Sequence, residues 1–127
     1  RNFPLDQNCN VNINRKFHEH ACRAATIARC AGKYGKFWEY HDKLFKNQSK
    51  ISAETTFQWG LDINLTKNQI NDCLKDLSIL DKIKDDINKG TQFGVRGTPS
   101  VFINGRKFIG NRNMISQAIR KEINNLY

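Results

Sequence analysis

The stretch that decides the fold is VRGTPSVFINGRKFIG, residues 95–110. Its Gly97-Thr98-Pro99 stands directly before an apolar run. Proline has no backbone N–H to donate to a neighbouring strand, and it is tolerated as the first residue of a strand because no such hydrogen bond is needed there. Asn104-Gly105 supplies the two positive-φ residues of a type I′ turn. The pattern therefore predicts a tight antiparallel hairpin of residues 100–103 and 107–109.

Pro99 lies at the mouth of that hairpin and is a candidate cis proline. A cis bond at this place would expose the backbone of Thr98 to an incoming partner. Only about 5–6% of X–Pro bonds in folded proteins are cis. The residues alone therefore favour an ordinary trans proline that starts a strand.

Length and charge limit the protein classes that fit. At 127 residues the chain makes one domain with a modest core, and no apolar run has the length of a membrane span. The net charge of +9 would suit nucleic acid or an anionic membrane as partner. However, the basic residues are dispersed through every segment, and no nucleic-acid motif accompanies them. We therefore expect a solvated basic surface and no nucleic-acid partner.

The four cysteines are Cys9, Cys22, Cys30 and Cys73, and none forms a Cys-x-x-Cys redox pair. On one predicted helix, Cys22 and Cys30 would lie about 12 Å apart. A disulfide tolerates Cα separations only up to roughly 7 Å. Cys9 precedes that helix, so a structural Cys9–Cys22 disulfide is favoured, with Cys9–Cys30 as the alternative. Cys30 and Cys73 stand among apolar residues and are expected to be buried thiols.

A metal site is not expected from the histidines. His18 and Cys22 share a face of the predicted helix, whereas His20 points away from it, and no further ligand is evident. His41 lies inside an aromatic stripe and is interpreted as a packed histidine at the edge of the core rather than a catalytic base.

Helical patterns fill most of the chain before the hairpin. The predicted helices cover residues 15–31, 37–45, 53–60, 67–74 and 79–90, and a last one follows a cap at Asn111 or Asn113. Ser52 is the expected N-cap of the third helix, and Thr66 with Gln69 forms a capping box for the fourth. Ser78 is the expected N-cap of the fifth helix, which is expected to end at Gly90. Phe17 and several alanines form the inward face of the first helix. The aromatic residues Phe37, Trp38, Phe45, Phe57 and Trp59 are assigned mostly to the core.

Several motifs, in order along the chain, resemble one known family. They are Phe3-Pro4-Leu5, His18-x-x-Ala21, Ala24-Ala25, Cys30-Ala31, GKFWEYHDKLF at 35–45, Gly60-Leu61-Asp62, Cys73-Leu74 and GVRGTP at 94–99. Together they are similar to the DsbA-like family of thioredoxin-fold thiol–disulfide oxidoreductases. Cys9 and Cys22 most resemble members fused to, or working with, vitamin K epoxide reductase homologues.

The resemblance implies an α/β, thioredoxin-like fold with a helical insertion, lacking the first strand and helix. Residues 1–127 would be a single partial domain, with a strand tail at 1–5, the insertion at 15–90, and the cis-proline loop, hairpin and C-terminal helix at 95–127. Two or three strands need a further strand to make a convincing sheet. The family's first strand, Cys-x-x-Cys and first helix are therefore expected upstream of Arg1.

The resemblance also assigns roles to the loop before the hairpin. Pro99 would be the cis proline, and Thr98, with Gly97 and Arg96, would contact the substrate backbone in a mixed disulfide. The expected partners are cysteine-containing secreted proteins and a membrane redox partner such as a vitamin K epoxide reductase homologue. The expected compartment is periplasmic or extracytoplasmic, with no cofactor beyond the cysteines.

Two alternatives stay open. The chain could be a non-catalytic thioredoxin-like module that holds peptides against the cis-proline groove. It could also be a relative of the glutathione transferase kappa or isomerase branch, in which another residue replaces the dithiol and glutathione is bound.

Overall fold

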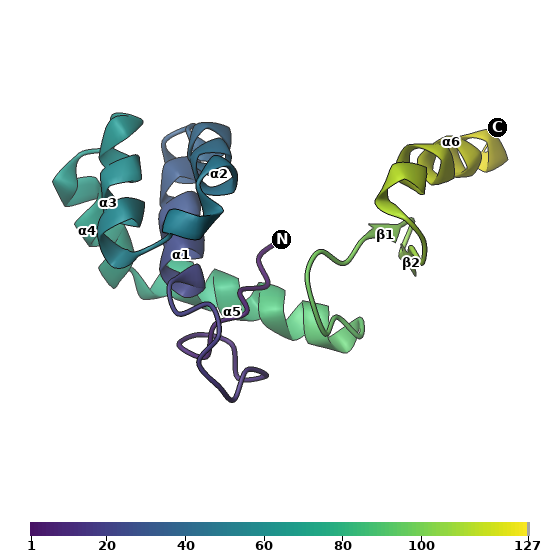
Figure 1. The fold of residues 1–127 in the computed structure, drawn as a ribbon, viewed down its shortest axis with the longest axis horizontal. Coiled ribbons are helices and arrows are strands. Elements are labelled where there is room, and N and C mark those ends of the chain that lie inside the picture. Colours follow the sequence, from purple (N-terminus) through teal and green to yellow (C-terminus); the bar gives the residue numbers. More distant parts are fainter. Residues whose placement is uncertain (127) are drawn as a thin grey trace. The chain divides into compact units, whose positions relative to one another are not determined.

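The computed structural model describes residues 1–126, and the chain divides into two compact units, Arg1–Gly94 and Val95–Tyr127 (Figure 1). Each unit is described by itself. No helix in the described part of the chain combines the length and the apolar character that crossing a membrane requires.

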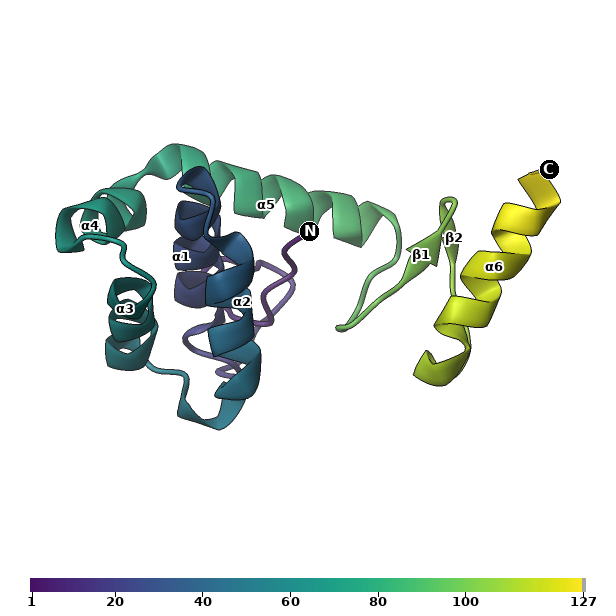
Figure 2. The ribbon, with the colours of Figure 1, turned by 90° about the horizontal axis from the view of Figure 1, so that it is seen from above.

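Unit 1 is a helical bundle centred on α1. Its elements are α1 (Ala21–Lys33), α2 (Phe37–Lys46), the short 3₁₀ helix η1 (Gln48–Lys50), α3 (Ala53–Asp62), α4 (Lys67–Lys75) and α5 (Leu77–Gln92). Helix α1 contacts each of the other four α-helices. Figures 1 and 2 both show α2 beside α1 and α5 crossing it.

Two groups of buried side chains form the core of unit 1. The first lies among α1–α4 and contains Ile27, Ala28, Ala31, Tyr40, Ile63, Leu65 and Ile70. The second contains Cys9, Cys30, Cys73 and three isoleucines of α5, Ile79, Ile83 and Ile87. Small alanines on α1 allow the neighbouring helices to approach closely. Gly60 of α3 does the same, because a Cβ there would lie 2.7 Å from Ile70 Cδ1.

Local capping residues explain where three helices begin. Ser52 starts α3 and Thr66 starts α4; in each capping box the side chain accepts a backbone N–H three residues on. These starts confirm the sequence predictions. The fifth helix differs, because Asp76 rather than Ser78 is its cap, accepting the Ser78 N–H at 2.9 Å. Helix α5 also continues through Gly90, which was expected to end it.

The first helix starts later than predicted. The periodic pattern suggested residue 15, but α1 begins at Ala21. Residues before it form a loop, in which the backbone N–H of His18 donates to the carbonyl of Leu5 at 3.2 Å. Phe17 therefore stands outside the helix and is 51% exposed, so its assignment to the packed face was wrong.

The aromatic stripe of α2 is only partly in the core. Tyr40 is fully buried and donates its hydroxyl to the Thr56 carbonyl at 2.9 Å, and burial raises the pKa of this phenol. Trp38 and Phe45 are 70% and 61% exposed, so the core assignment was wrong for these two. The side chains of α2 that pack in or against the first core group are Tyr40, Phe37 and Leu44. His41 stacks on Phe45 along the outer face.

Residues 1–5 form no strand, contrary to expectation, because the described part of unit 1 contains no strand with which they could pair. Hydrogen bonds hold this segment instead. Asn10 Nδ2 donates to the Pro4 carbonyl at 2.8 Å, and the Asn2 N–H donates to Asp86 Oδ2 at 2.9 Å. Asp86 also pairs with Arg29, which links the segment to α1 and α5.

Unit 2 consists of the hairpin and the last helix. Strand β1 (Phe102–Ile103) pairs antiparallel with β2 (Arg106–Lys107), with Phe102 opposite Lys107. Asn104 and Gly105 have φ of 48° and 77°, so the predicted Asn-Gly turn is confirmed, although the strands are shorter than expected.

A short 3₁₀ helix η2 (Arg112–Met114), capped by Asn111, leads into α6 (Ile115–Leu126). Helix α6 contacts β1, yet none of its described side chains is buried. Ile119 and Ile123 are 42% and 49% exposed. The described chain is thus mostly helical with one two-stranded sheet, an arrangement compatible with part of a thioredoxin-like fold.

Candidate thiol-exchange site and the two disulfides

The loop from Arg96 to Pro99 precedes β1 in unit 2. The Thr98–Pro99 peptide bond is cis. Arg96, Thr98 and Pro99 are exposed and Gly97 is half-buried. Ser100 Oγ donates to the Gly97 carbonyl at 2.7 Å, which closes the loop against the start of the hairpin. The backbone around Thr98 is therefore held at the surface of unit 2.

A pocket of about 230 Å³ begins at Pro99 and continues between the hairpin and the start of α6. Its lining residues are Pro99, Ser100, Val101, Lys107, Phe108, Gly110, Arg112 and Ile115. The two cations give it a positive character, and Gly110 leaves room for the Phe108 ring, which a Cβ would approach to 3.0 Å. Binding pockets for drug-sized ligands usually exceed about 300 Å³. This pocket is therefore of a size for one side chain.

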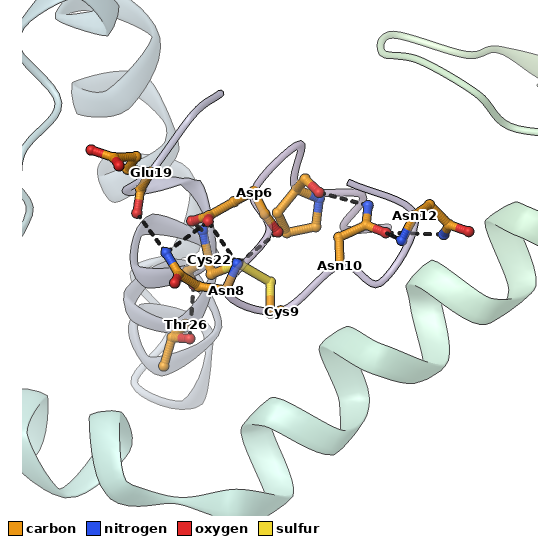
Figure 3. Close-up of a disulfide and its surroundings, with 9 residues drawn as sticks. Asp6, Asn8, Cys9, Asn10, Asn12, Glu19, Cys22 and Thr26 are labelled. Atoms are coloured by element: carbon orange, nitrogen blue, oxygen red, sulfur yellow. Dashed lines mark hydrogen bonds between the residues drawn. A yellow bond between two sulfur atoms is a disulfide. The ribbon is translucent and has the colours of Figure 1, made fainter. Parts of the chain in front are cut away.

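The first disulfide joins Cys9 and Cys22, the pair favoured from the sequence, with a Cα–Cα distance of 5.9 Å. Figure 3 shows that it ties the N-terminal loop to the first turn of α1. Asp6, fully buried, organises this loop. Its Oδ2 accepts the Cys22 N–H at 2.9 Å, and its Oδ1 accepts the Asn8 N–H at 2.9 Å (Figure 3).

The second disulfide joins Cys30 and Cys73, which corrects the expectation of two buried thiols. Both residues are buried, at 0% and 3% exposure. Cys30 lies on the inner face of α1 and Cys73 on the inner face of α4. Because these helices pack directly together, the two Cα atoms are 5.8 Å apart, within bonding range.

The sequence prediction missed both Asp6 and the second disulfide. The chain has four cysteines, so once Cys9 and Cys22 are paired, Cys30 and Cys73 remain. The even number of cysteines could therefore have predicted the second disulfide. No comparable signal marks Asp6, because a charged residue in a polar loop is normally exposed.

His18 and His20 lie in the loop that precedes α1. Among residues 1–126, no group of three or more His, Cys, Asp or Glu side chains is placed to hold a metal ion. His20 stands directly before α1, where its side chain makes no capping hydrogen bond.

Comparison with known proteins identifies the family. A family model described as Thioredoxin matches residues 11–124. The chain therefore belongs to the thioredoxin-fold family, of the DsbA-like kind that includes disulfide oxidoreductases. No solved structure gives a significant match.

Similar proteins include a disulfide oxidoreductase and antiporters. The chain is 32% identical over 132 residues to the "Putative protein-disulfide oxidoreductase" of Rickettsia bellii. This alignment covers 94% of the chain and 49% of the Rickettsia protein. It is 31% identical over 97 residues to the "Na(+)/H(+) antiporter NhaA 1" of Salinispora arenicola, covering 76% of the chain. A second antiporter, from Salinispora tropica, is 30% identical over the same share. The chain spans only 15% of either antiporter.

Proposed function

We propose that this chain is the substrate-binding part of a thiol–disulfide oxidoreductase that exchanges disulfides with cysteine-containing proteins. The observation that carries the proposal is the exposed Arg96–Pro99 loop beside a side-chain-sized pocket. Family membership and the similarity to the Rickettsia protein supply the reaction class.

In the proposed complex, a substrate segment lies extended along the loop. The backbone of Thr98 forms hydrogen bonds with the substrate backbone, as a strand does at an exposed edge. Arg96 and Gly97 flank the segment. A substrate side chain next to the cysteine enters the pocket at Pro99, where Lys107 and Arg112 favour segments of low positive charge.

The reaction is exchange through a mixed disulfide. A thiolate attacks one sulfur of a disulfide, the other sulfur leaves as a thiolate, and a second thiol resolves the mixed disulfide. Residues 1–127 contain no Cys-x-x-Cys. In this proposal the attacking dithiol is therefore supplied from outside residues 1–127, and the loop positions the substrate against it.

The compartment proposed for this reaction is extracytoplasmic, because two disulfides in a 127-residue chain suit an oxidising environment. A membrane redox partner, of the vitamin K epoxide reductase type, is proposed to return the dithiol to its working state.

The test is disulfide exchange by the complete reading frame that contains residues 1–127, measured on a peptide with two cysteines. Thr98→Pro removes the backbone N–H proposed to bind substrate and should raise KM by about tenfold, which corresponds to the loss of one hydrogen bond. Gln117→Ala, on the exposed surface of α6 and outside the pocket lining, is the matched control and should behave like the parent.

Absence of exchange by the parent protein contradicts the reaction class. Equal KM values for Thr98→Pro and the parent contradict the role of the loop. Peptide binding without exchange would instead identify a non-catalytic peptide-binding module.

A further inference from the structure

We infer that the Cys9–Cys22 disulfide is a second thiol-exchange site, which accepts electrons from a partner dithiol while the fold of unit 1 is retained. The inference goes beyond the function proposed above, because it concerns a bond in unit 1 and does not require the Arg96–Pro99 loop.

The two disulfides of unit 1 differ in accessibility. Cys30 and Cys73 are both buried between helices. Cys22, in contrast, is half-buried, and its partner Cys9 is 7% exposed. An incoming thiolate must reach a sulfur along the S–S axis, so the disulfide that includes a half-buried residue is more accessible than one between two buried residues. That half-buried residue is Cys22, which packs against the second core group and whose Sγ lies 3.6 Å from the Asp6 carbonyl.

Cys22 is also placed where a thiolate is stabilised. It is the second residue of the 13-residue helix α1, and the positive end of the helix dipole favours negative charge there. The buried Asp6 carboxylate opposes this effect but is already engaged by the N–H groups of Cys22 and Asn8.

The loop has non-covalent anchors that remain when the disulfide opens. Asp6 holds the Cys22 and Asn8 backbones, and Asn10 Nδ2 holds the Pro4 carbonyl (Figure 3). The Asn12 side chain donates to Thr91 Oγ1 of α5 at 3.0 Å. The two thiols therefore stay close together after reduction, and the bond can re-form readily. A bond that opens without releasing its loop is suited to repeated exchange.

The chemistry balances with one partner dithiol. A partner thiolate attacks Cys22 Sγ, the Cys9–Cys22 bond breaks, and Cys9 leaves as a thiolate that takes a proton from water. The second partner thiol, deprotonated, then attacks the partner sulfur of the mixed disulfide and releases Cys22. The partner becomes a disulfide, and Cys9 and Cys22 gain two electrons and two protons.

The first test uses the unmodified chain in graded mixtures of reduced and oxidised glutathione. Thiols are trapped by alkylation and located by peptide mass spectrometry, while circular dichroism follows the helices. Cys9 and Cys22 should be alkylated at least about tenfold faster than Cys30 and Cys73, with the helical signal unchanged. Simultaneous opening of both bonds, earlier opening of Cys30–Cys73, or loss of helix when Cys9–Cys22 opens would overturn the inference.

The second test asks which sulfur reacts. Cys9→Ser leaves Cys22 unpaired, and Cys22→Ser leaves Cys9 unpaired, so the two variants are matched. With oxidised glutathione, Cys9→Ser should form the mixed disulfide about tenfold faster than Cys22→Ser. Equal rates, or a faster reaction of Cys9, would contradict the assignment of Cys22. The glutathione readouts do not depend on the Arg96–Pro99 loop, so their failure is distinguishable from failure of the proposed function.

Discussion

Removal of the Cys30–Cys73 bond should cost unit 1 a large part of its stability. The change is the double variant Cys30→Ala with Cys73→Ala. The bond closes a loop with a sequence separation of 43, for which loop-closure entropy gives about 4 kcal/mol. Both side chains are buried, so truncation adds a packing loss of roughly 1 kcal/mol. The free energy of unfolding should therefore fall by about 5 kcal/mol, whereas the whole free energy of unfolding of a typical domain is about 5–15 kcal/mol.

The assay is urea unfolding, followed by circular dichroism and by the fluorescence of Trp59, which packs against the first core group. The control is Cys9→Ala with Cys22→Ala. Its bond has a sequence separation of 13, for which the same relation gives about 3 kcal/mol. The free energy of unfolding should be highest for the parent, lower for the Cys9/Cys22 variant and lowest for the Cys30/Cys73 variant. A Cys30/Cys73 variant as stable as the Cys9/Cys22 variant would refute the reasoning.

Three further predictions concern unit 1, each measured by urea unfolding. Tyr40→Phe removes the buried hydrogen bond to the Thr56 carbonyl and should cost about 1 kcal/mol, whereas unchanged stability would show that this bond contributes nothing. Gly60→Val places side-chain atoms where a Cβ alone lies 2.7 Å from Ile70 Cδ1, and it should cost roughly 1–3 kcal/mol; a stabilised variant would contradict the close helix packing. Hydrogen bonds from Ser78 and Lys33 lower the pKa of Asp76 from its usual value of 3.8. The ionised carboxylate therefore stabilises the folded state above about pH 3.8, and this stabilisation is lost as the pH falls through the lower pKa of the folded state. The Asp76→Ala variant should therefore have a lower free energy of unfolding at neutral pH, and this free energy should fall less than that of the parent below about pH 4. An equal fall in the variant and the parent would contradict this.

Features set by neighbouring residues were predictable from the sequence. The Asn104-Gly105 turn and the Thr66–Gln69 capping box each depend on a few consecutive residues, and the structure contains both. The family was also recognisable, because motifs such as GVRGTP recur in the expected order.

Features set by tertiary packing were not predictable in the same way. The Cys30–Cys73 bond requires the packing of α1 on α4, which no local pattern shows. The late start of α1 depends on the link from His18 to Leu5, which competes with helix formation. Trp38 follows an apolar pattern but faces outward, because periodicity marks a stripe without saying which edge of it is covered.

The candidate site was predictable in part. Arg96, Gly97, Thr98 and Pro99 were selected from the sequence, and they form the exposed loop before β1. The pocket beside them could not be foreseen, because Arg112 and Ile115 reach it only when η2 and α6 fold back beside the hairpin. Their contribution to substrate binding remains a prediction.

The measurement that tests the central claim most directly is an amide NMR titration of this chain with an extended peptide. One peptide contains a cysteine and its matched control has serine instead, so that binding is separated from exchange at Cys9–Cys22. We expect shifts of the Arg96, Gly97 and Thr98 amides and of the pocket residues with both peptides. Shifts confined to α1–α5, or no shifts with either peptide, would contradict the claim that this loop receives the substrate.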